Sequence, residues 1–201
     1  MMKNRIVIID NGHGYNTPGK CSPDKSFFEW EWNRMFAKLL KSALDDLGYT
    51  TFLIVEEDVD ISLSERARRA NVIINKYGAG NCVFISIHCN AAGNGQWMNA
   101  TGFSVWTTKG TTNSDKLAEH LCNACAPEGI KLRTDMSDGD KDYEANFTVI
   151  FKTNCPAILT ENLFMDNKGD LTILKSEEGV QKLLNLHVNG IQAYFDAKFN
   201  K

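Results

Sequence analysis

The sequence lacks long apolar runs, basic clusters and a recognisable leader. No apolar segment approaches the roughly 20 residues that cross a bilayer, so we expect no membrane partner. With 22 basic and 25 acidic side chains the net charge is −3, which argues against nucleic acid as a partner. Residues 1–4 lead directly into an apolar pattern and leave no room for a signal peptide. We therefore expect a chain that is made and kept in the cytoplasm.

Cysteine is present at six positions, but the pattern lacks the second pair of a zinc ribbon. Cys122 and Cys125 form one C-x-x-C inside a helical pattern, which we interpret as helix packing. Cys82, Cys89 and Cys155 lie in or beside apolar runs, where a reduced thiol packs like a small hydrophobic group. No disulfide is required.

Strand and helix patterns alternate along the chain. Short runs rich in aliphatic and aromatic residues predict strands, and apolar residues at helical spacing predict helices between them. The predicted strands are 5–10, 49–55, 82–88, 101–107 and 156–161, and the predicted helices are 27–47, 62–77, 113–126 and about 177–198. The polar segment 133–147 predicts a surface loop. This order favours one α/β domain over residues 1–201, with a twisted, mostly parallel or mixed sheet and helices on both faces.

Three predicted strands lead to a side chain that can bind a metal or move a proton. The first leads to His13 in the motif IIDNGHG, the third ends at His88, and the last ends at Glu161. Since ligands of open α/β sheets bind at the carboxyl ends of strands, these side chains are expected to converge. Taken singly, they also fit a turn histidine, a strand-end histidine and a solvated carboxylate. His120 and His187 lie in helical patterns without nearby acids, and we interpret both as packing residues.

Two histidines leave a catalytic metal short of ligands, because zinc in such sites usually has three protein ligands and a water. The segment SFFEWEWNRMF offers Glu29 and Glu31 at the start of a predicted helix. A structural role for Glu29 is also open, since Ser26 and Glu29 fit the S-x-x-E pattern of a capping box.

A resemblance to a known family runs from residue 6 to about 167. The motifs IIDNGHG, EWEWNR, SERARRAN, FISIHCNAA and PAILTENLFMDN occur in this order. They resemble the motifs of the zinc-dependent N-acetylmuramoyl-L-alanine amidases of the amidase-3 family. The resemblance implies a fold of the type called phosphorylase/hydrolase-like, which zinc peptidases also have. Asn11 stands where the family usually has proline, and Leu163 where it has glycine, which leaves the shape of the loop beside Glu161 open.

Carried over position by position, the resemblance implies Zn²⁺ bound by His13, Glu29 and His88. Glu29 is preferred to Glu31 because it stands four residues before an asparagine, as in the family motif E-x-x-x-N. Glu161 falls on the family's catalytic glutamate. Asp10 and Asn90 are candidates for orienting the metal ligands.

The implied reaction is hydrolysis of the amide bond between N-acetylmuramic acid and the L-alanine of the stem peptide in peptidoglycan. A zinc peptidase and a non-catalytic peptidoglycan-binding protein are the alternatives. Without an export signal or a wall-binding module, the chain resembles a phage or prophage endolysin that reaches the cell wall after release. The alternative is a toxin that a secretion apparatus delivers. We expect a monomer. Trp97 and Trp106 could stack on sugars, although a large aromatic residue near a strand more often belongs to the core.

Overall fold

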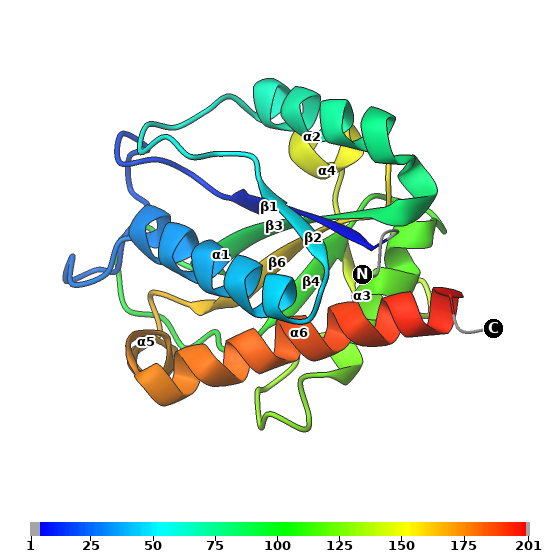
Figure 1. Cartoon of the computed structure of the whole chain (residues 1–201). Helices are drawn as coiled ribbons and strands as arrows, with labels where there is room; N and C mark the ends of the chain where they lie inside the picture. Colours follow the sequence, from blue (N-terminus) through cyan, green and yellow to red (C-terminus); the bar gives the residue numbers. More distant parts are fainter. Residues whose placement is uncertain (1–4, 200–201) are drawn as a thin grey trace.

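The computed structural model describes residues 5–199, and a six-stranded sheet forms its centre (Figure 1). The strands lie in the order β2-β1-β3-β6-β4-β5. β1, β2, β3 and β6 run parallel, whereas β4 is antiparallel to β6 and β5 is parallel to β4. The bounds are Ile6–Asn11 for β1, Thr50–Leu53 for β2, Cys82–Asn90 for β3, Ser104–Thr107 for β4, Tyr143–Glu144 for β5 and Ala157–Phe164 for β6. The predicted mixed, mostly parallel α/β sheet is confirmed.

Helices cover both faces of this sheet, because its central strands are apolar on both sides. In β1, Val7 and Ile9 face one apolar cluster while Ile6 and Ile8 face the other. α2 and α4 cover the second cluster, and α1, α3, α5 and α6 cover the first (Figure 1). The helices are α1 Glu29–Asp46, α2 Leu63–Tyr77, α3 Asn113–Asn123, α4 Thr148–Phe151, α5 Lys168–Lys175 and α6 Glu177–Phe199, with a 3₁₀ turn at Ala79–Asn81. Within residues 5–199, no helix combines the length and the apolar character that crossing a bilayer requires.

Three short elements, α4, β5 and α5, were not predicted from the sequence. α4 has four residues and β5 has two, which is too short for a periodic pattern to register. α5 has eight residues and follows β6 after a tight turn. Segment 133–147 is therefore not only a surface loop. It contains β5, which pairs with β4, and a buried acidic residue, Asp142.

Asp142 makes the stability of this edge of the sheet depend on pH. Burial, together with the nearby charge of Asp140, raises the pKa of Asp142 to about 7, although the hydroxyl of Thr107 donates to it at 2.6 Å. The unfolded chain releases this proton near the ordinary pKa of an aspartate, about 3.9. Between these two pH values the folded state holds the proton more tightly, so this stabilising contribution is lost as the pH rises from about 4 to about 7.

We expect Asp142→Asn to remove this part of the pH dependence. Denaturant unfolding of wild type and variant at pH 4.5 and pH 8 measures it: the wild type should lose more stability on going to pH 8 than the variant does. Asp138→Asn, the same change at an exposed position of the same loop, serves as the control. Equal pH slopes for wild type and Asp142→Asn would contradict the assignment.

Candidate active site

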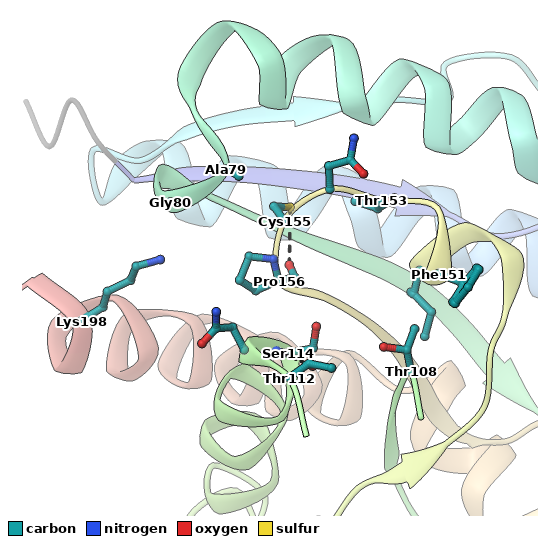
Figure 2. Close-up of a pocket in the computed structure, with 13 residues that line it drawn as sticks. Ala79, Gly80, Thr108, Thr112, Ser114, Phe151, Thr153, Cys155, Pro156 and Lys198 are labelled. Carbon is teal, nitrogen blue, oxygen red and sulfur yellow. Dashed lines mark hydrogen bonds between the residues drawn. The ribbon is translucent and has the colours of Figure 1, made fainter. Parts of the chain in front are cut away.

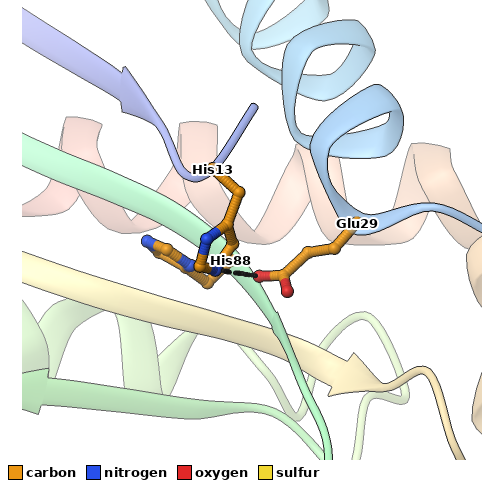
Figure 3. Close-up of side chains that lie close together, drawn as sticks. All are labelled: His13, Glu29 and His88. Atoms are coloured by element: carbon orange, nitrogen blue, oxygen red, sulfur yellow. Dashed lines mark hydrogen bonds and ion pairs between the residues drawn. The ribbon is translucent and has the colours of Figure 1, made fainter. Parts of the chain in front are cut away.

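The structure brings His13, Glu29 and His88 together at one edge of the sheet (Figure 3). One potential ligand atom from each of the three lies within 4.8 Å of the others. Oε1 of Glu29 is 3.0 Å from Nδ1 of His88 and 3.5 Å from Nε2 of His13. The two imidazole rings are nearly perpendicular, at 88°, with centroids 4.9 Å apart. His13 follows β1, His88 lies near the end of β3, and Glu29 is the first residue of α1.

Glu29 is a buried carboxylate with incomplete hydrogen bonding. It is 1% exposed, and its Oε1 accepts from the backbone N–H of Cys89 at 3.1 Å. Its Oε2 has no hydrogen-bond partner in the part of the chain that the structure describes. A buried charge needs compensation, and a cation beside two imidazoles would provide it. The donor set therefore fits a metal ion.

The capping role considered for Glu29 is wrong. α1 is capped by Phe28, without a side-chain hydrogen bond, and the carboxylate of Glu29 points instead at the two histidines (Figure 3). Glu31, the other candidate, is exposed.

The protonation states suit metal binding. Burial lowers the pKa of His13 to about 4, so its imidazole is neutral near pH 7, the form that binds metal. Burial would lower the pKa of His88 too, but its hydrogen bond to Glu29 and the charge of Glu29 raise it. Burial would raise the pKa of Glu29, and the same bond lowers it. A metal ion would replace the proton that this pair shares.

The glycines beside His13 permit this approach. A Cβ at Gly12 would collide with the imidazole of His88, and a Cβ at Gly14 would collide with the backbone of Asp60. His13 itself has a φ of 64°, in the left-handed region. Glycines on both sides of the imidazole are therefore a steric requirement of this loop.

Arg66 supports the His13 loop through hydrogen bonds to its backbone carbonyls. This role was not predicted from the sequence. The side chain of Arg66, 1% exposed, donates to Oδ1 of Asp10 at 2.6 Å and to the carbonyls of Asn11 at 2.7 Å and His13 at 3.2 Å. A second hydrogen bond to Asp10 comes from the hydroxyl of Ser86 at 2.6 Å. Asp10 thus acts through Arg66 and not directly on a metal ligand. The signal was the leading arginine of the motif SERARRAN.

Two asparagines of the motifs have different roles from each other. Asn33 donates to the carbonyl of Gly12 at 3.1 Å and so links α1 to the same loop. The side chain of Asn90, expected to orient a ligand, instead accepts from the backbone N–H of Ala91 at 2.8 Å. The expectation for Asn90 is wrong because this turn at the end of β3 uses its side chain locally.

Glu161 lies beside the three-residue cluster. On β6 it is directly opposite His88 of β3. Burial raises its pKa to about 7; the charge of His88 opposes this shift and that of Glu29 adds to it. Its Oε2 is buried without a hydrogen-bond partner among residues 5–199. A carboxyl in this state can exchange a proton near neutral pH.

Leu163 retains the backbone shape that glycine would favour. Its φ is 65°, and it lies in a β-bulge, since Asn90 opposes Phe164 where regular pairing would place an earlier residue. The left-handed conformation costs a leucine about 1–2 kcal/mol. Burying its side chain in the core, where it is 2% exposed, contributes about 1.5–3 kcal/mol. The bulge beside Glu161 is therefore maintained by packing.

The remaining candidates lie in the core or at its edge. Trp106 stacks on Tyr143 with ring centroids 4.8 Å apart, and Trp97 packs against the first apolar cluster. His187 is fully buried and bonds the carbonyl of Leu183 at 2.8 Å, as a packing residue would. A separate pocket, lined in part by Ala79, Pro156 and Lys198, lies at the amino ends of β3 and β6, opposite to the site (Figure 2).

Comparison with known proteins identifies the family. The family model for N-acetylmuramoyl-L-alanine amidase matches residues 7–193. The chain belongs to this amidase family. It is 31% identical over 201 residues to the N-acetylmuramoyl-L-alanine amidase CwlM of Bacillus licheniformis, covering 96% of this chain and 70% of that protein. It is 28% identical over 197 residues to the endolysin of Bacillus phage SPP1, covering 96% and 67%. Its enzyme class is that of an N-acetylmuramoyl-L-alanine amidase.

A solved amidase has the same architecture. The crystal structure of the N-acetylmuramoyl-L-alanine amidase from Clostridium difficile 630 matches with a TM-score of 0.81 and 30% identity, covering 96% of this chain and 97% of that one. The amidase fold predicted from the motifs is confirmed.

We expect Arg66→Met to destabilise this amidase by about 3–5 kcal/mol, because it leaves Asp10 as an unpaired buried charge. Asp10→Asn combined with Arg66→Met should recover part of the loss. Denaturant unfolding of the wild type, both single variants and the double variant measures the coupling. Additive effects of the two substitutions would show that the pair is not a unit.

Proposed function

We propose that this amidase binds Zn²⁺ through His13, Glu29 and His88 and hydrolyses the amide bond between N-acetylmuramic acid and L-alanine in peptidoglycan. The observation that carries the proposal is the convergence of the three donor atoms within 4.8 Å around a buried carboxylate. Two imidazoles and one carboxylate are a common donor set for catalytic zinc, which leaves a coordination position open. All three donors come from one chain, so a monomer is sufficient.

When bound, zinc supplies an acidified water and polarises the scissile carbonyl. Glu161 is the proposed general base. Its pairing with His88 across β3 and β6 supports this role, and a pKa of about 7 suits both taking and giving a proton. Glu161 would accept the proton of the attacking water and pass it to the departing amine nitrogen as the C–N bond breaks.

The rest of the site keeps the donors in place and their charges balanced. The N–H of Cys89 fixes the Glu29 carboxylate, and Arg66 and Asn33 fix the loop of His13 through backbone carbonyls. Such preorganisation lowers the cost of binding the metal in one geometry.

The bond that is cut distinguishes this function from that of a zinc peptidase. Digestion of purified sacculi followed by mass analysis separates the two: an amidase releases intact stem peptides from unsubstituted glycan, whereas a peptidase shortens the peptides. Family membership and the endolysin and amidase relatives support the first outcome. They also support action on the cell wall.

Removing one ligand should remove the metal. We expect the purified protein to bind about one zinc per chain, and His13→Ala, His88→Ala and Glu29→Ala each to lose most of it, because three protein ligands are the minimum for such a site. Elemental analysis of dialysed protein measures the zinc. Glu31→Ala, the same change two residues along α1 at an exposed position, should keep both zinc and activity. Retention of stoichiometric zinc by both histidine variants would refute the ligand assignment.

Glu161→Gln tests the general base. Glutamine keeps the size of the side chain and still bonds water, but it cannot accept a proton. The variant should fold and bind zinc normally while turnover falls roughly 100-fold or more. Zinc content and release of stem peptide are measured on the same preparation. Loss of zinc together with activity would make Glu161 a ligand, and near-normal turnover would remove it from the mechanism.

A further inference from the structure

Among residues 5–199, one arginine forms no ion pair with a carboxylate. Arg5, Arg34, Arg66, Arg68 and Arg69 each form an ion pair with a carboxylate. Arg133, the sixth arginine of the sequence, forms none within the described part of the chain. This exception in a protein of net charge −3 needs a reason, because nearby acids are abundant.

Arg133 lies one strand away from Glu161, across β4, on the side away from the metal ligands. Its backbone N–H donates to the carbonyl of Phe103 at 2.8 Å. The next residue, Ser104 of β4, is directly opposite Glu161 of β6. Since β6 lies between β3 and β4, Arg133 and the metal ligands flank Glu161 from opposite sides.

Two aromatic rings hold the guanidinium. Its Cζ lies 4.8 Å from the ring centroid of Phe164, three residues beyond Glu161, and 5.4 Å from that of Tyr143. Gly102 leaves room for the side chain, because a Cβ there would lie 3.0 Å from Cγ of Arg133. A guanidinium fixed in this way binds a carboxylate through two parallel hydrogen bonds with little further loss of side-chain freedom.

The local field also favours an anion. Lys20 is tied to the site through its carbonyl, which accepts from the backbone N–H of Glu29 at 3.0 Å, and no ion pair occupies its ammonium group among residues 5–199. Lys20 and Arg133 are therefore two cationic side chains that form no ion pair within residues 5–199.

The substrate of the proposed function carries its free carboxylate on one side only. On the sugar side of the scissile amide, the lactyl carboxyl is itself part of the bond. On the peptide side, L-alanine is followed by a glutamyl residue that continues through its side-chain carboxyl, so its α-carboxyl is either free or amidated.

We propose that Arg133 binds the free α-carboxylate of this glutamyl residue, and that it thereby determines both the stem-peptide preference and the direction in which the substrate crosses the site. This proposal rests on the proposed function. The peptide would leave on the β4 side of Glu161, and the sugar would lie on the side of His13.

Two matched substrates test the proposal with the zinc-loaded full chain. Both are N-acetylmuramoyl-L-alanyl-D-glutamyl compounds whose side-chain carboxyl is capped as the methylamide; one has a free α-carboxyl and the other an α-carboxamide. The wild type should prefer the carboxylate by about 10-fold or more in kcat/KM, the usual worth of hydrogen bonds to a charged group. Arg133→Gln should abolish the preference, chiefly through KM, and leave the carboxamide within about twofold.

Two further variants separate recognition from structure. Arg133→Lys keeps the charge but not the paired donors, so part of the preference should remain. Arg68→Gln, an equal change on the exposed face of α2, should behave as the wild type. An equal loss on both substrates in Arg133→Gln, or no preference in the wild type, would overturn the proposal. Failure of the wild type to cleave either substrate or sacculi would instead contradict the proposed function itself.

Discussion

The buried ion pair between Asp10 and Arg66 is the interaction on which the site depends. It connects the last residues of β1 to α2, and the same guanidinium reaches the carbonyl of His13. It shares the support of this left-handed loop with Asn33, which donates to the carbonyl of Gly12 at 3.1 Å, and with Arg34, which donates to the carbonyl of His13 at 3.0 Å. Such pairs rarely add net stability over an apolar replacement, because desolvating two charges is costly. Here the ion pair contributes to position: it helps to hold His13 at a defined distance from Glu29 and His88.

Much of the fold and of the site could be predicted, because the strands are recognisable in the sequence and the site lies at their carboxyl ends. Continuous apolar runs identify buried parallel strands, and parallel strands bring their carboxyl ends to one edge. His13, His88 and Glu161 met there as expected. β5 and α4 could not be predicted, since two and four residues carry no periodicity and form only when β4 and the core offer a surface.

The errors at the site share a physical cause. A capping box and a buried carboxylate at Glu29 have the same local sequence, and only the position of His88, 59 residues away, decides between them. The partner of Asp10 likewise lies 56 residues along the chain, on a helix whose basic residues resemble a solvated face. Leu163 shows the reverse case, in which packing maintains a backbone shape that the residue type disfavours. In each case the role of the residue is decided by contacts with residues far away in the sequence, and local sequence patterns carry no information about such contacts.

Two carboxylates in one site are driven to different states by their surroundings. Glu29 receives a backbone N–H and a histidine, and its pKa falls despite complete burial. Glu161 receives no such bond on its buried oxygen, and its pKa rises to about 7. Groups whose environments separate their pKa values in this way take different tasks in catalysis. Glu29 stays an anion, as its proposed role as a metal ligand requires, while Glu161 can hold or release a proton. The fold creates this difference by placing one carboxylate at the start of α1, beside the N–H of Cys89, and the other on β6 opposite His88, where its Oε2 has no hydrogen-bond partner among residues 5–199.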